Sequence, residues 1–355
     1  MRTARQRRAL WRACLPAALA TIAFAGAAAA DELPGTTAWA RSSQARGLAG
    51  SSLPLLIRSS PTDAVTVSRR LVATVCSAGC ASAPTTAATP QGAVRVSSEH
   101  WTLEVDADGT SARYVDSAVE ARARSMGRDP AQRMPADALE RAGRSVIAST
   151  LGSVVTAGSG EEIVPIATYY RSEGGHDFKT GQDTTVVVAN RIVFGRTIGG
   201  VPVVGGGSTI VLTFANDGSV ESFRYDWPTY RATASLRAVV GAGEVLRRVQ
   251  RVIGARTGVS ALAVSVAVPT PSHAQPVAPV GGVSLESLEC GYYDPVSVRR
   301  DASAAVQAGC VYRAVARVDG ATRSGLAGAV PVAAQVEPDA AWPEARILRG
   351  ESQIR

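Results

Sequence analysis

The residues best suited to chemistry lie in one polar, glycine-rich stretch, residues 171–183, with the sequence RSEGGHDFKTGQD. His176 stands there between a glycine and Asp177, and Glu173 lies three residues before it. A histidine beside carboxylates can carry a proton or bind a metal at neutral pH. A histidine in a polar loop is also often only a solvated side chain. Both interpretations are open, and the first would make the protein a hydrolase.

The rest of the chain offers no fuller catalytic set. No Gly-x-Ser-x-Gly nucleophile elbow occurs, and the carboxylates are scattered rather than paired as glycosidases need. Residues 106–109, Asp-Ala-Asp-Gly, are similar to the start of a calcium loop but lack the third acidic ligand and the distal glutamate. A hairpin turn is expected there instead. We therefore predict no catalytic residue, no metal site and no cofactor.

Four cysteines follow the N-terminal segment, and an even number favours disulfides in an exported protein. They are Cys76, Cys80, Cys290 and Cys310. Three pairings are open, and the favoured one is local, first to second and third to fourth. The latter bridge would close a loop of about twenty residues and contribute on the order of 3 kcal/mol. Zinc is the rival interpretation, but each of the three histidines is isolated in the sequence.

Residues 1–30 have the features of an export signal. Basic residues precede an apolar, alanine-rich core, from Cys14 to Ala30, that ends just before Asp31. Small residues at −3 and −1 predict cleavage after Ala30. No other stretch is long and apolar enough to suggest a membrane span. We therefore expect an exported protein, periplasmic or extracellular, without a membrane span once the signal is cleaved.

The formal charge of +7 overstates how basic the exported protein is. The signal carries five arginines and no acid, which leaves the mature chain at about +2. No basic patch with interleaved aromatic residues occurs, so nucleic acid is not an expected partner.

The first part of the mature chain is expected to contain a flexible lead followed by a small β-rich region. Residues 31–65 are rich in Ser, Gly, Pro and Ala and are typical of a flexible lead. Residues 66–130 are predicted to be a small β-rich region. It would contain a strand over residues 66–76 and a hairpin over 101–115, whose turn is Asp-Gly.

Two helices with apolar residues at helical spacing are predicted further along, over residues 136–151 and 243–253. Each is followed by several strands. Runs of strands without alternating helices favour an α+β fold, in which helices pack on antiparallel β-meanders. The expected units are residues 131–235 and 236–340, followed by a loose tail at 341–355.

Strand and turn signals agree best over residues 190–230. β-branched and aromatic runs are broken there by glycines and by Asn216-Asp217-Gly218, which is typical of antiparallel strands. This stretch supplies the candidate partner-binding residues, Gly200, Pro202, Gly205, Tyr225, Trp227 and Tyr230. The glycines either mark bulges or let a ligand or another backbone approach closely. The aromatic residues either bind a partner or pack in the core.

The run from Gly200 to Gly206, GVPVVGG, followed by a strand, an Asp217-Gly218 turn and another strand, resembles PepSY and thermolysin-type propeptide domains. The upstream helix fits the same layout, and residues 236–340 are similar to a more divergent second copy. The resemblance implies a non-catalytic module that assists folding, inhibits a protease or binds partners outside the cytoplasm. Because no His-Glu-x-x-His sequence follows, any protease inhibition would act in trans.

We therefore expect an exported, non-catalytic binding or regulatory protein, with an exported protease or a cell-envelope protein as its partner. Two alternatives remain open. One is an exported hydrolase with a site near His176, and the other is a structural protein of the cell surface.

We predict that the mature protein, isolated from an oxidising compartment, contains no free thiols because its four cysteines form two disulfides. Thiol titration in denaturant measures this directly, with the reduced protein as the control that reveals every cysteine. Two or more thiols titrating before reduction would contradict the two-disulfide scheme.

Overall fold

The structure is a computed structural model, and most of what it describes lies between residues 51 and 334. The described residues are 48, 51–59, 62–76, 83–90, 92–128, 133–177, 179–257, 264–265, 283–294, 305–318 and 322–334. The predicted signal, residues 1–30, and the expected tail, residues 341–355, lie outside this part of the chain.

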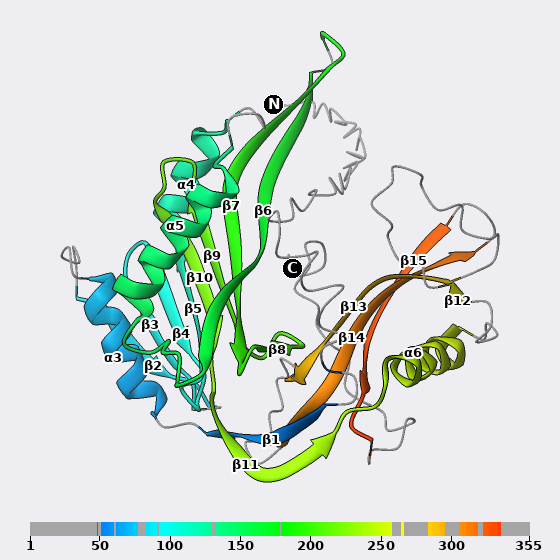
Figure 1. Ribbon diagram of the computed structural model, residues 1–355. Coiled ribbons are helices and arrows are strands. Elements are labelled where there is room, and N and C mark those ends of the chain that lie inside the picture. The colour runs from blue at the N-terminus through cyan, green and yellow to red at the C-terminus, as the bar shows by residue number, and fades with distance from the viewer. Residues whose placement is uncertain are drawn as a thin grey trace, which may run out of the picture.

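Two lobes share one large sheet (Figure 1). The first lobe comprises the described residues between 64 and 227, and the second comprises residues 51–59 together with the described residues between 229 and 333. The strands of the first lobe are β2 (Thr85–Ala88), β3 (Val94–Ser97), β4 (Trp101–Val105), β5 (Ser111–Asp116), β6 (Glu161–Asp177), β7 (Gln182–Ile198), β8 (Val201–Val204), β9 (Thr209–Ala215) and β10 (Val220–Asp226). Its helices are α3 (Ala64–Val75), α4 (Ser117–Ser125) and α5 (Ala136–Val146), which continues as a π-helical turn over Ile147–Leu151.

In the described part of the second lobe, helix α6 (Ala242–Thr257) packs against the strands through Val245, Val249 and Ile253. Its strands are β1 (Ser52–Ser59), β11 (Thr229–Ala238), β12 (Val264–Ser265), β13 (Val283–Tyr293), β14 (Ala305–Val318) and β15 (Thr322–Pro331). Among the described residues the sheet has 15 strands, in the order β11-β1-β14-β13-β8-β7-β9-β10-β5-β4-β3-β2, with β6 on β7, β15 on β14 and β12 on β13.

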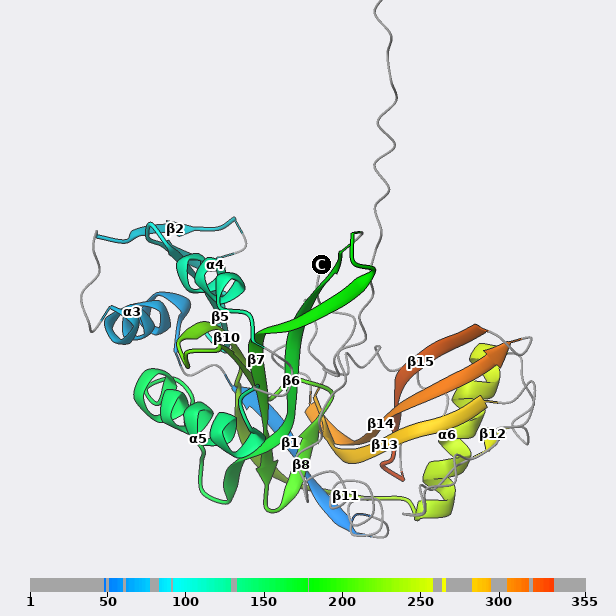
Figure 2. The ribbon, with the colours of Figure 1, turned by 90° about the horizontal axis from the view of Figure 1, so that it is seen from above.

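The core of the first lobe lies between one face of its strands and helices α3 and α5, which lie beside each other in Figure 2. Leu71 of α3, Leu139 of α5 and Leu103 of β4 are all fully buried there. Helix α3 begins after Asp63, whose carboxylate accepts the backbone N–H of Thr66 at 2.9 Å. That bond satisfies one of the free donors at the helix start.

Strand β1 belongs to the second lobe although it precedes the first lobe in the sequence. It pairs antiparallel with β11 over most of its length and with β14 through Leu56 and Ile57. Leu53 and Leu56 are buried in the second core with residues of α6, β13 and β14. The described chain therefore passes from the second lobe into the first and back into the second.

The predicted disulfide between Cys290 and Cys310 is confirmed. The two cysteines lie directly opposite each other in β13 and β14, with their Cα atoms 4.0 Å apart. Both side chains are buried in the second core, so the bridge is a structural link between neighbouring strands. Cys76 is disulfide-bonded as well, and Cys80, its predicted partner, lies outside the described residues.

The prediction of an α+β fold, with helices packed on two antiparallel meanders, was wrong. The protein is mainly β, with few helices beside one large mixed sheet. Strands from the two expected units also join in one sheet, because β8 of residues 131–235 pairs in parallel with β13 of residues 236–340. Hydrophobic patterns indicate where strands form, but strand partners distant in the sequence leave no local signal.

Three local predictions were also wrong. Residues 66–76, expected as a strand, lie in helix α3, because the apolar residues Ala64, Val67 and Leu71 share one face and outweigh the β propensity of the segment. Residues 52–59, placed in a flexible lead, form β1. Within residues 171–183, expected as a loop, residues 171–177 belong to β6 and residues 182–183 belong to β7. The hairpin over residues 101–115 and the helix at 136–151 are confirmed.

Glycines let the two lobes approach at one point. The backbone N–H of Gly207 donates to the carbonyl oxygen of Asp294 at 2.7 Å, and the N–H of Asp294 donates to Val204 at 2.8 Å. A Cβ atom added to Gly207 would lie 2.5 Å from the carbonyl oxygen of Asp294. Of the alternatives open for this glycine run, the close approach of another backbone is therefore the one observed.

We predict that Gly207→Ala lowers the free energy of unfolding by about 1–3 kcal/mol, because the backbones of the two lobes must move apart. Gly241→Ala is the matched control, since a Cβ atom there would meet nothing within 4 Å, and a change below about 0.5 kcal/mol is expected. Denaturant unfolding measures both. Equal effects of the two substitutions would contradict the close-approach explanation.

Candidate functional site

Three of the six residues predicted to bind a partner, Gly205, Tyr225 and Trp227, are buried. Tyr225 and Trp227 are buried in the first core, with 1% and 5% of their surface exposed. The carbonyl oxygen of Pro202 packs against Gly291, where a Cβ atom would overlap it. Gly205 lies against the backbone of Asp294 in the same way. These residues thus pack the interior and the junction of the lobes.

The other two candidate binding residues, Gly200 and Tyr230, have different surroundings. Gly200 lies in the tight turn between β7 and β8, with φ of 76°, and no other residue lies near its missing Cβ position. Tyr230 is half-buried on β11, and its hydroxyl donates a hydrogen bond to the carboxylate of Asp294. Gly200 thus shapes an exposed turn, whereas Tyr230 belongs to the junction between the lobes.

A buried polar network occupies the junction around Tyr230. The Asp294 carboxylate is fully buried and pairs with Arg58 of β1, whose Nε lies 3.0 Å from Oδ2. The hydroxyl of Ser208 lies 2.8 Å from that of Tyr230. Burial raises the pKa of Tyr230 to about 12, against the opposing effects of Ser208 and the nearby arginines. Tyr230 is therefore a neutral donor at any physiological pH.

Arg196 lies beside this network and is itself buried. Its guanidinium stacks 3.9 Å from the ring centre of Trp227 and 5.1 Å from that of Tyr230. It donates to the carbonyl oxygen of Pro228 at 2.7 Å, and Glu161 lies 3.8 Å from its Nε. Burial lowers the pKa of Arg196, and Glu161 opposes that shift. Trp227 thus serves as a cation–π partner inside the fold.

The residues of the hydrolase alternative do not converge. His176 of β6 contacts the Asp183 carboxylate of β7 at 2.7 Å, directly across the strand pair. Glu173 lies three positions earlier on the same strand, so it faces the opposite side, and it contacts Arg124 at 3.5 Å. The side chain of Asp177 lies outside the described part of the structure. The described geometry gives no support to a hydrolase centred on His176.

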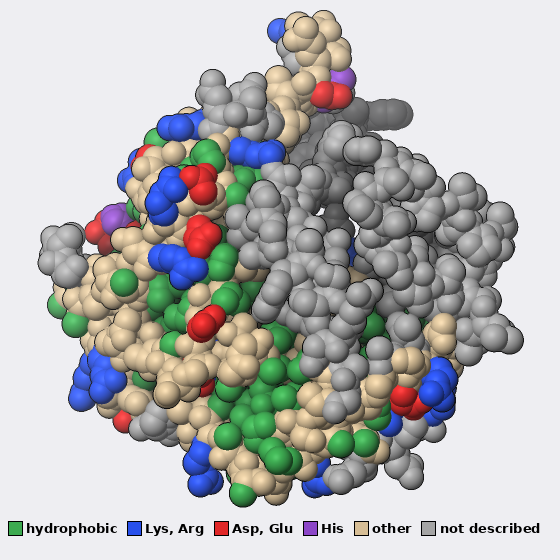
Figure 3. Space-filling model, viewed as in Figure 1, with side chains coloured by type: hydrophobic (Ala, Val, Ile, Leu, Met, Phe, Trp, Pro, Cys, Tyr) green, Lys and Arg blue, Asp and Glu red, His purple; other side chains and the backbone are tan. Residues whose placement is uncertain are grey.

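These residues instead belong to a projecting element, which we call the arm and define as residues 172–177 and 182–186. In the arm, β6 and β7 continue as a two-stranded ribbon beyond the point where β7 pairs with β9 at Ala189 (Figure 1). The described side chains from Ser172 to His176 and from Gln182 to Thr185 are exposed. In the space-filling view the projecting part of the molecule carries few charges except near its tip (Figure 3).

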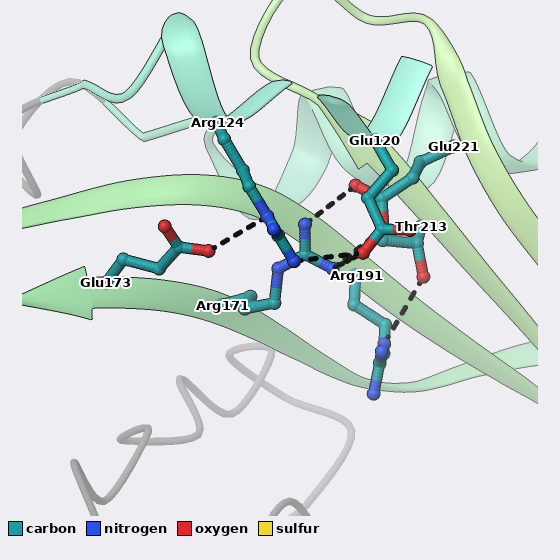
Figure 4. A network of polar contacts seen from close by, with 7 residues as sticks. All are labelled: Glu120, Arg124, Arg171, Glu173, Arg191, Thr213 and Glu221. Carbon is teal, nitrogen blue, oxygen red and sulfur yellow. Dashed lines mark hydrogen bonds and ion pairs between the residues drawn. The ribbon is translucent and has the colours of Figure 1, made fainter. Parts of the chain in front are cut away.

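A network of charged residues lies where the arm leaves the sheet (Figure 4). Arg171 of β6 forms two hydrogen bonds with the carboxylate of Glu221, at 2.8 and 3.1 Å. Arg124 of α4 contacts Glu120 at 3.4 Å and Glu173 of the arm at 3.5 Å. Arg191 donates to Thr213 at 3.3 Å, and its pKa is lowered by burial and by the neighbouring charge of Arg171.

Sequence reasoning missed both the arm and the network at its root. A signal for the arm was present, since polar residues with Gly174-Gly175 and Thr180-Gly181 separate two β-branched runs, as in a long hairpin. The network had no comparable signal. Its charged residues are spread from Glu120 to Glu221, and only strand pairing brings them together.

Comparisons with known proteins do not assign the chain to a family. No protein-family model matches it, and no curated protein matches it. One similar solved structure is the crystal structure of an uncharacterised protein from Eubacterium rectale ATCC 33656 at 1.45 Å resolution. It shares 9% sequence identity over 83% of this chain and 86% of that chain, with a TM-score of 0.41. A likeness at this level carries no argument about function.

Two further observations concern the described residues alone. They contain no group of three or more His, Cys, Asp or Glu side chains placed to hold a metal ion. No helix among them is both long enough and apolar enough to cross a membrane.

We predict that Asp294→Asn lowers the free energy of unfolding by on the order of 3 kcal/mol, because it removes the carboxylate that neutralises the buried Arg58. Asp137→Asn on α5 is the control, since Asp137 pairs with Arg141 at 2.7 Å on an exposed surface, where less than about 1 kcal/mol is expected. Denaturant unfolding measures both variants. A loss for Asp294→Asn no larger than for the control would contradict a stabilising junction.

Proposed function

We propose that this protein is an exported, non-catalytic binding protein whose arm binds an extended segment of a partner protein. The observation that carries the proposal is the projection of a two-stranded ribbon from an otherwise packed sheet. A two-stranded hairpin alone is at best marginally stable in water. From Ser172 to His176 the arm adds no residue to either core. A contact outside the chain would explain why such an element is kept.

The chemistry of the arm suits recognition by strand addition. Within the described structure, residues 172–177 and 182–186 pair only with each other, so each strand has an outer edge without a strand partner. Such edges offer backbone donors and acceptors to an added strand. Gly174 and Gly175 leave the backbone accessible, and no proline interrupts either strand of the arm.

The class of partner protein is suggested by the compartment to which this protein is proposed to be exported. The signal-like segment at residues 1–30 supports export, and the Cys290–Cys310 disulfide is typical of proteins in oxidising compartments. An exported protease or a cell-envelope protein is therefore the proposed partner. The resemblance of residues 200–225 to propeptide domains agrees with a protein partner, and the proposal does not depend on it.

We predict that a photo-crosslinking amino acid placed at Thr184, on the exposed arm, forms one defined protein adduct in the native extracytoplasmic fraction. The same amino acid at Arg141, exposed on α5, is expected to give no adduct, because α5 lies in the first lobe away from the arm. Gel analysis and mass spectrometry of the adducts measure this.

A shortened arm provides the second control. Replacing residues 175–184 by Asn-Gly closes the ribbon at the Gly174–Thr185 pair with a two-residue turn. The melting temperature should change by less than about 4 °C because no core residue is lost. Unlabelled full-length protein should suppress the Thr184 adduct, and the shortened protein should not. Equal suppression by both, or equal adducts from Arg141, would refute the binding role of the arm.

A further inference from the structure

We infer that Arg171 and Glu221 are positioning residues that fix the direction in which the arm projects. This inference rests on the proposed binding role of the arm, because direction matters only if the arm must meet a partner. Three features at the root of the arm restrain or bend it. These are a bulge in the strand pair, a buried ion pair, and a backbone bridge to the segment after α4.

The bulge lies where the arm departs from the sheet. Arg171 pairs with Ala189, but the next residue, Ser172, pairs with Val187, so Val188 is an extra residue on β7. An extra residue bends a strand and increases its local twist. The bend thus coincides with the last β6 residue before the arm, which is Arg171. Without a further restraint, a ribbon bending at one bulge would sample a range of directions.

The ion pair restrains the β6 side of this bend. Glu221 is itself the extra residue of a bulge on β10, between Val220 and Ser222. Its carboxylate is only 5% exposed and meets the Arg171 guanidinium through two parallel hydrogen bonds. A two-point contact fixes orientation as well as distance. The residue next to the bend is thereby tied to the fixed strands of the sheet.

A backbone bridge restrains the β7 side. Arg128, just after α4, exchanges two hydrogen bonds with Val187, at 3.0 and 2.7 Å. The side-chain amide of Asn216 donates to the carbonyl oxygen of Val187 at 2.7 Å. Gly127 lies so close to Val186 that a Cβ atom there would be 2.9 Å from it. Both strands of the arm are therefore held at their root.

The exposure of the charged side chains indicates which ion pair restrains the arm most strongly. The contacts of Arg124 with Glu120 and Glu173 are long, and the Arg124 side chain is 61% exposed. Water and salt weaken such contacts strongly. Arg171 and Glu221 are 24% and 5% exposed, and their pair is shorter. The Arg171–Glu221 pair is therefore the restraint whose loss should release the arm.

Spin labels attached at Thr184→Cys on the arm and Arg113→Cys on β5 report the arm direction as a distance distribution. The wild-type background is expected to give one narrow distribution. Glu221→Gln should widen it at least about twofold, because the amide cannot replace the paired carboxylate. Arg171→Lys keeps the charge but loses the two-point contact and should widen it as well. Asp137→Asn, in an exposed pair, should leave it unchanged.

Circular dichroism melts identify which variants are folded, and Arg171→Lys tests the inference if Glu221→Gln does not fold. A folded Glu221→Gln or Arg171→Lys variant with the wild-type distribution would overturn the positioning role. The distance measurement needs no partner. If the Thr184 adduct is absent while the distribution widens, the positioning stands and the binding role fails. If the adduct forms but the distribution stays narrow, the binding role stands and the positioning fails.

Discussion

The buried pair of Arg58 and Asp294 connects parts of the chain that are 236 residues apart. Arg58 lies one residue before the end of β1, the first described strand, and Asp294 directly follows β13. Charges in a protein interior are tolerated only when they are paired and hydrogen-bonded. This pair meets that condition with the help of Tyr230. The pair thereby ties β1 and β11 to the end of β13, beside the point where β8 pairs with both β7 and β13 and joins the strands of the two lobes.

The junction also explains why glycine is needed at two positions of the glycine-rich run. Gly205 and Gly207 lie where the chain of the first lobe passes the backbone of Asp294. Side chains there would hold the two backbones apart and break the hydrogen bonds between Gly207 and Asp294. Of the candidate binding residues, Gly205 and Tyr230 are therefore parts of the junction, and Tyr225 and Trp227 are parts of the first core. Their chemistry is directed inward, and the arm is the element directed outward.

Sequence patterns predicted features that depend on near neighbours. The Cys290–Cys310 bridge could be inferred from an even cysteine count and short spacing, and the turn at Asn216–Gly218 from its composition. Helix α3 was missed although Asp63 and the apolar spacing signalled it, because β-branched residues were given more weight. The Arg171–Glu221 pair could not be inferred. Its members are fifty residues apart, and two bulges determine that they meet.

By itself, the sequence determined the positions of many strands, one disulfide, the compact turns and the expectation of an export signal. These follow from local propensity, residue spacing and composition, which act over a few residues. Only the tertiary structure decided that β1 pairs with strands much later in the sequence, that Tyr225 and Trp227 are buried, and that residues 172–177 and 182–186 project as an arm. Segments distant in the sequence compete to pair with the same strand edge. Which segment pairs there depends on the packing of the whole sheet.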